Sequence, residues 1–294
     1  MTEGAPRTAL LAAAALALVL AARPPIAPSP AAAETPAAAP SGNAMLDFDP
    51  WPGIRKDLFG ARDIAEDEAR ISLDAPVRAE DAALVPITVR IPAATAADVT
   101  RLTLIVDKNP APIAAAFTFG PGAGLGDRVV TTRVRVDMYT HIRAVVETAD
   151  GRLLMAAKYV KAAGGCSAPA LKDADEALAQ LGRMQLRTFD PAAATSPRSK
   201  ALREAQVMIK HPNYSGMQMN QLTGLYIPAK YVQQMEVRRD GELVFKLEGG
   251  ISLSEDPNIR FTYADGGPGG GALEVTARDT DGREFKTRAT SSGS

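Results

Sequence analysis

The chain has 294 residues, and its 33 Lys and Arg nearly balance its 34 Asp and Glu, which gives a formal net charge of −1. This balance supplies no basic field for nucleic acid, so we expect no nucleic-acid partner. The length suggests two domains. Only 5% of the residues are aromatic, and we therefore expect cores built mainly from Val, Ile and Leu.

The N-terminus has the pattern of an export signal. Arg7 precedes the apolar run TALLAAAALALVLAA at residues 8–22, which is short for a bilayer core of about 30 Å. Three alanines at 31–33 fit a small-residue cleavage site, and cleavage near Ala22 is an alternative. We therefore expect a signal peptide at 1–33 and a periplasmic mature protein without stable membrane insertion. An uncleaved anchor is the competing interpretation.

A Pro/Ala-rich stretch follows the signal, and we expect a disordered spacer at 34–47. The first domain then extends over residues 48–166. It begins with a predicted short helix within 48–64 that ends at Gly60. The large apolar residues of this helix should pack against the domain: Trp51, Leu58 and Phe59.

The remainder of the first domain is rich in predicted strands. Its segments alternate apolar and polar residues, end in turn formers and have no helices between them, which is typical of an antiparallel sandwich. The glycine-rich run at 120–126 follows no strand–helix–strand pattern and is predicted to be a loop. Asp150-Gly151 predicts a hairpin with a type I′ turn.

The domain boundary follows, with a predicted helical linker at 167–200 because apolar residues in 171–189 recur near helical spacing. The second domain, at 201–294, is again rich in strands, with Asp-Gly hairpins at Asp240 and Asp281. We therefore predict an all-β fold of two immunoglobulin-like β-sandwich domains joined by a helical linker. Apolar second-half segments such as LYIPAKYV lead us to expect that the two halves pack together.

Conventional catalysis finds little support in the sequence. The two histidines are assigned structural positions, His141 half-buried on a strand and His211 in a turn before proline. No Ser/His/Asp motif or metal-binding motif of recognisable spacing is present. Met217 and Met219 could offer thioether ligands to copper(I), but packing is the simpler explanation. We expect neither an enzyme nor a bound metal or cofactor.

Cys166 is the one residue that suggests a chemical role. It is the only cysteine, so it has no intramolecular partner in an oxidising compartment. Gly164 and Gly165 precede it, and small residues follow, which predicts a mobile arm with an accessible thiol. A thiolate on such an arm can exchange sulfur groups. The residues alone leave two alternatives, a covalent carrier and an incidental surface cysteine.

Two sets of motifs resemble known families. KNPAPIAAAFTFGPGA and the segment ending in KYVKAAGGC resemble SoxY, the sulfur-carrying subunit of the bacterial thiosulfate-oxidising system. VMIKHPNYSG, LYIPAKYVQQMEV and SEDPNIRFTY resemble SoxZ. The order is that of a fusion, most similar to the quinoprotein dehydrogenase-associated SoxYZ-like carrier proteins. Ser167 and Ala168 replace the trailing glycines of the SoxY arm, and here the arm continues into a linker, so its reach should be smaller.

The resemblance implies a periplasmic, non-enzymatic carrier in sulfur oxidation. Cys166, on the arm formed by Gly164 and Gly165, would hold a sulfur-containing or other thiol-reactive group. Its partners would be periplasmic enzymes that load and unload the arm, among them a quinoprotein (PQQ-dependent) dehydrogenase. The alternative is a non-covalent adaptor for such a dehydrogenase. The cargo, including whether it derives from thiosulfate, is left open.

Overall fold

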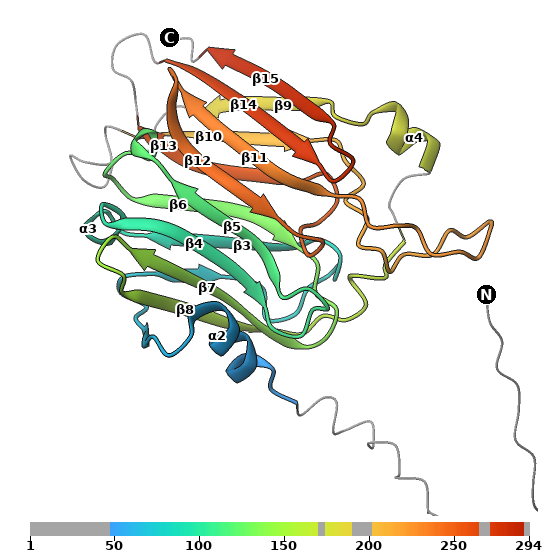
Figure 1. The fold of residues 1–294 in the computed structure, drawn as a ribbon, viewed down its shortest axis with the longest axis horizontal. Helices are drawn as coiled ribbons and strands as arrows, with labels where there is room; N and C mark the ends of the chain where they lie inside the picture. Colours follow the sequence, from blue (N-terminus) through green and yellow to red (C-terminus); the bar gives the residue numbers. More distant parts are fainter. Residues whose placement is uncertain (1–47, 170–173, 190–201, 265–270, 291–294) are drawn as a thin grey trace, which may run out of the picture.

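The computed structural model describes residues 48–169, 174–189, 202–264 and 271–290, so the predicted signal peptide and spacer lie outside it. Two β-sheets lie face to face across the described part of the chain (Figure 1). The larger sheet has nine strands in the order β1-β8-β7-β4-β5-β12-β11-β14-β15. In that order their bounds are Ile64–Glu66, Leu153–Val160, Thr140–Thr148, Val99–Val106, Ile113–Phe119, Glu242–Gly249, Val232–Arg239, Ala272–Asp279 and Glu284–Thr290.

The smaller sheet has six strands among the described residues, in the order β2-β3-β6-β13-β10-β9. Its strands alternate buried and outward-facing residues, as a sheet covered on one face requires. Neighbouring strands of both sheets are antiparallel, except that β1 runs parallel to β8. The bounds, in sheet order, are Ser72–Asp74, Val85–Ile91, Arg128–Val134, Asn258–Ala264, Leu202–Ile209 and Met184–Phe189.

Both sheets continue from the first half of the chain into the second. In the larger sheet β5 pairs with β12, and in the smaller sheet β6 pairs with β13. Phe245 of β12 lies between the sheets, with its ring 5.5 Å from that of Phe117 and 5.0 Å from that of Phe261. Residues from both halves therefore form one continuous apolar core, and the prediction that the halves pack against each other is confirmed.

The predicted N-terminal helix is present as α2, which spans Trp51–Phe59 and ends at Gly60 with a φ of 63°. It covers a small apolar cluster on the outer face of the larger sheet, where Trp51 and Leu58 pack against Val145 and Leu153. Figure 1 shows this helix beside β7 and β8. The only other helical segments among the described residues are α3 (Ala93–Ala96), η1 (Pro121–Ala123) and α4 (Ala174–Ala179).

The predicted linker helix is largely wrong. In its described part, α4 covers only Ala174–Ala179, and residues 184–189 form β9, which pairs with β10 of the second domain. The apolar spacing of residues 184–189 resembles that of a helix, but these residues form a strand because they pair at the edge of the smaller sheet. A second detail also differs: at the hairpin after β7, Gly151 has a positive φ and Asp150 does not, whereas a type I′ turn needs both.

Candidate functional site

The cysteine arm follows β8 and is bound to the body of the first domain. The Gly164 amide donates to the Asp137 carbonyl at 2.8 Å, and the Gly165 amide donates to the Val136 carbonyl at 3.0 Å. Gly164 has a φ of 79°, a backbone conformation that other residues rarely adopt. The chain therefore turns at Gly164 and places Cys166 against the protein.

Gly165 is needed for packing. A Cβ atom at this position would lie 2.1 Å from the Ala82 carbonyl oxygen and 2.7 Å from the Val136 carbonyl oxygen. Only a residue without a side chain lets the arm approach the two backbones so closely. The two glycines were expected to make the arm mobile, but in this structure they let it dock.

Cys166 is fully buried, with 0% of its surface exposed. The expectation of an accessible thiol is therefore wrong for this conformation. The Cys166 amide donates to Asp137 Oδ1 at 3.3 Å, and the Ser215 hydroxyl donates to the Cys166 carbonyl. Asp137 belongs to the first domain and Ser215 to the second, so the arm lies at the junction of the two domains.

Arg135 lies beneath the arm and reaches both domains. Its side chain donates to the Gly165 carbonyl at 3.1 Å and to the Asn213 carbonyl at 3.4 Å. Only 1% of Arg135 is exposed, and burial lowers the pKa of its guanidinium. This buried cation joins the arm to the second domain without itself being available to solvent.

A buried amide network holds Arg135 and its surroundings in place. Asn109 donates to the Arg135 carbonyl at 2.8 Å and to Ser252 Oγ at 2.9 Å, and it accepts from the Asp137 amide. In the second domain Asn213 donates to the Leu253 carbonyl at 3.1 Å. The two asparagines thus fix the segments on either side of the arm.

Electrostatics at the arm keep the thiol protonated. Burial raises the pKa of Cys166 to about 12; the Asp137 carboxylate raises it further, while the Arg135 guanidinium acts in the opposite direction. Because the thiolate is the nucleophile in sulfur exchange, a thiol with this pKa is unreactive near neutral pH. The docked conformation is therefore a resting one as far as thiol chemistry is concerned.

The histidines do not join the arm in a catalytic group. His141 lies on β7 as predicted, but it is exposed rather than half-buried, and its ring packs 5.1 Å from that of Tyr159. His211 is buried, and its Nε2 lies 3.7 Å from Asp279 Oδ2. Burial lowers the pKa of His211 to about 4, so the pair is not an ion pair at neutral pH. The described residues contain no group of three or more His, Cys, Asp or Glu side chains that could hold a metal ion.

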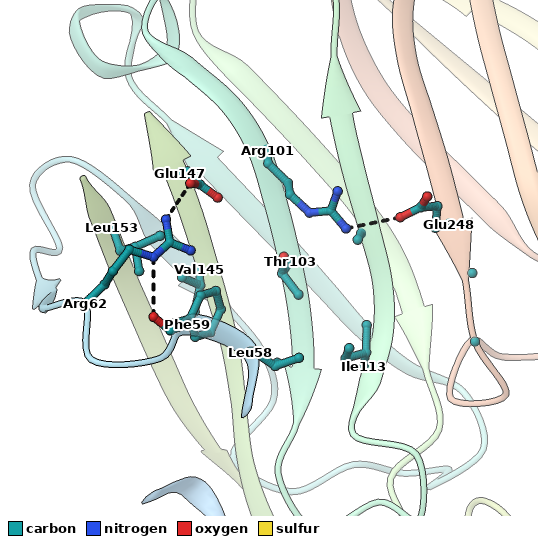
Figure 2. A pocket seen from close by; sticks show the side chains of 13 residues that line it. Leu58, Phe59, Arg62, Arg101, Thr103, Ile113, Val145, Glu147, Leu153 and Glu248 are labelled. Atoms are coloured by element: carbon teal, nitrogen blue, oxygen red, sulfur yellow. Dashed lines mark hydrogen bonds and ion pairs between the residues drawn. The ribbon is translucent and has the colours of Figure 1, made fainter. Parts of the chain in front are cut away.

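A groove of about 390 Å³ opens on the outer face of the larger sheet, beside α2. Figure 2 shows Leu58, Phe59 and Ile113 on its apolar side. Two ion pairs flank it, Arg62 with Glu147 at 2.5 Å and Arg101 with Glu248 at 3.1 Å (Figure 2). Because each cation already has a carboxylate partner, the groove offers no unpaired charge to a ligand.

Two mainly antiparallel sheets, packed over one core and with a cysteine arm at the domain junction, define a two-domain β-sandwich protein. Comparison with protein families assigns each half. Residues 55–166 match the family of the sulfur oxidation protein SoxY, and residues 193–290 match that of the sulphur oxidation protein SoxZ. Both are immunoglobulin-like sandwich folds, which confirms the predicted fold class. The chain is a SoxYZ-like fusion, and its SoxY match ends at Cys166.

Among solved structures, the sulfur carrier protein SoxY from Chlorobium limicola f thiosulfatophilum is 26% identical over 38% of this chain and 91% of its own, with a TM-score of 0.31. A β-glycosidase from Bacteroides vulgatus is 9% identical over 75% of this chain and 25% of its own, with a TM-score of 0.22. A tetra-tandem repeat from a large adhesion protein is 12% identical over 74% of this chain and 47% of its own, with a TM-score of 0.24. These TM-scores are too low to add to the assignment. A search of curated proteins found no match.

Proposed function

We propose that this protein is a carrier of the sulfur-oxidation type that holds a sulfur-containing group covalently on Cys166 and presents it to a partner enzyme. One observation carries the proposal. The single thiol of the chain lies outside the strands, on a two-glycine arm at the end of the SoxY match. A thiol placed there can leave the protein body without unpairing a strand.

The docked arm is the resting state of this carrier. Release requires the loss of the polar contacts that Ser215, Arg135, Asp137 and Val136 make with the arm. A Cβ atom added at Gly164 would meet no other atom within 4 Å, which leaves room for a hinge there. Once the sulfur is in water, the desolvation that raises its pKa is removed and a thiolate can form.

The loading step must balance its electrons. When Cys166 is joined to a cargo that bears a thiol, one S–S bond forms and two protons and two electrons leave. The loading partner is therefore an oxidising enzyme that accepts two electrons. Alternatively, the thiolate attacks a cargo that already has a disulfide, and a second thiolate leaves without net oxidation.

The remaining elements of the proposal come from the sequence. The N-terminal signal pattern supports a periplasmic location, and the resemblance to quinoprotein dehydrogenase-associated carriers supports a PQQ-dependent dehydrogenase as the oxidising partner. No helix in the described part of the chain is both long and apolar enough to cross a membrane.

Intact mass of the protein purified from cells that naturally produce it, before and after reductant, tests the proposal. We expect a mass increment that maps to Cys166 and disappears on reduction. A bare thiol under every growth condition would contradict the carrier.

A non-covalent adaptor for a dehydrogenase is the second candidate, and the complete burial of Cys166 favours it. In that case the arm would serve only to pack the junction between the two domains. The adaptor predicts that a Cys166→Ala protein, if folded, supports the partner enzyme as well as the natural protein does, whereas the carrier predicts that activity dependent on loading is lost.

A further inference from the structure

A long loop of the second domain carries three strongly exposed apolar side chains, and the base of this loop contacts the arm. We call residues 215–230 the apolar hairpin; it is the orange loop that projects from the sandwich in Figure 1. Leu222 is 97% exposed, Leu225 69% and Tyr226 67%. Side chains of this size are seldom left so exposed together without a function in binding.

The apolar hairpin has a defined conformation. Met219 and Tyr226 form a β-bridge, and the Ile227 amide donates to the Gln218 carbonyl at 2.8 Å. At the tip, Asn220 Oδ1 accepts from the amides of Leu222 and Thr223. The exposed side chains are therefore held on an ordered turn, which reduces the entropy lost on binding.

The base of the hairpin contacts the cysteine arm. The Ser215 hydroxyl lies within hydrogen-bond distance of both the Cys166 carbonyl and Gln218 Oε1, which is 3.0 Å away. A hydroxyl has one proton, so it can donate to only one of these acceptors at a time. A partner that moves the hairpin can thus change the contact that holds the arm.

We propose that the apolar hairpin is the docking element for the enzyme that acts on Cys166, and that this partner is a folded protein with an apolar cleft. The inference rests on the proposed carrier function. A projecting tip requires a concave partner surface, and contact at the hairpin places that surface next to the arm.

The lack of charged residues in the hairpin argues against a membrane as its binding partner. Residues 212–229 contain no Asp, Glu, Lys or Arg, whereas peripheral membrane binding usually adds basic residues to the apolar ones. The nearest following cation, Lys230, is paired with Asp281 at 2.7 Å. A second copy of this chain is also disfavoured, because a tip inserted into the groove of another copy makes a heterologous contact, which builds rings or filaments rather than the two-fold dimer that is the commonest oligomer.

The test uses the full chain in the cells that naturally produce it. Leu222→Ser with Leu225→Ser removes the apolar tip and leaves the backbone contacts and Asn220 in place. The matched control is Leu125→Ser, which changes a 68% exposed leucine in the first domain. Each protein is purified, and the fraction of Cys166 that carries a reducible mass increment is followed with time.

We expect the natural protein and the Leu125→Ser control to acquire the increment at equal rates, and the double variant to acquire it about tenfold more slowly. The purified double variant should keep the natural rate of alkylation by iodoacetamide, which shows that its arm is still docked. Equal loading of all three proteins would overturn the docking proposal alone. A natural protein without any increment would instead overturn the carrier function on which it rests.

Two further measurements test the other possible binding partners of the hairpin, a membrane and a second copy of the chain. Binding to vesicles of phosphatidylethanolamine and phosphatidylglycerol that is lost in the double variant would overturn the proposal in favour of a membrane. Dimerisation in sedimentation velocity that is lost in the double variant would overturn it in favour of a second copy. We expect neither.

Discussion

The Ser215 hydroxyl of the second domain donates a hydrogen bond to the backbone carbonyl of Cys166 in the first domain. The bond is buried and joins the arm to the SoxZ-like half. We predict that Ser215→Ala lowers the free energy of unfolding by about 1 kcal/mol and speeds alkylation of Cys166, because the arm loses a hydrogen bond that holds it to the second domain. Ser167→Ala is the control, since its hydroxyl bonds only to Gly164 within the arm. Equal alkylation rates in both variants would show that the bond does not restrain the arm.

A Cβ atom at Gly165 would collide with two backbone carbonyl groups. Gly165→Ala should therefore displace the arm and make Cys166 react faster with a thiol reagent in the folded protein. Gly151→Ala is the control for the general cost of replacing a glycine, because Gly151 has a positive φ and an added Cβ there would meet open space. A thiol that remained unreactive in Gly165→Ala would contradict the docked arrangement.

Cys166→Ser replaces a buried sulfur by a hydroxyl. We expect a loss of about 1–3 kcal/mol in the free energy of unfolding, because the serine hydroxyl would be buried without a hydrogen-bond partner. Cys166→Ala, which adds no polar group, should lose less than the serine variant. Urea denaturation of both variants checks the order, and an unchanged serine variant would indicate that the arm is undocked in solution.

His211 makes stability depend on pH. Burial lowers its pKa from 6.5 to about 4, so the folded state binds its proton less readily than the unfolded state does. Stability from this group is complete above pH 6.5 and falls as the pH is lowered towards 4. Denaturation midpoints across this window should fall in the natural protein and in a His141→Gln control, and they should fall less in His211→Gln. An identical slope in His211→Gln would rule this histidine out as the cause.

Phe245 lies at the centre of the joint core, beside Phe117 and Phe261, with 0% exposure. Phe245→Ala should cost about 3–5 kcal/mol, because it leaves a cavity where the two domains meet. Since the core is continuous, we also expect a single calorimetric unfolding transition. Two separate transitions in the natural protein would mean that the halves unfold independently.

Much of the fold could be predicted from alternation and turn residues. The strand-rich character of both halves, the helix that ends at Gly60 and the contact between the halves were expected. The strand β9 was missed because its residues continued a helical spacing from α4, and only pairing with β10 decides its conformation.

The site was predicted in part. Cys166 could be singled out because it is alone, but its burial depends on carbonyl groups of Ala82 and Val136 that are distant in sequence. Arg135 and Ser215 were also missed. A signal for Ser215 was present, because it lies in the HPNYSG segment that carried the SoxZ resemblance.

The pairing of strands across the junction has a consequence for aggregation. Apart, the halves would leave β5, β12, β6 and β13 as open edges with apolar faces, which can recruit other chains. Joined, the sheets end in β1 and β2, of three residues each, and in β9 and β15, where Arg187 and Lys286 face outward. Short and charged edges are poor templates for further strands. Fusion of the two domains in one chain ensures that the vulnerable edges find each other before they meet a neighbouring molecule.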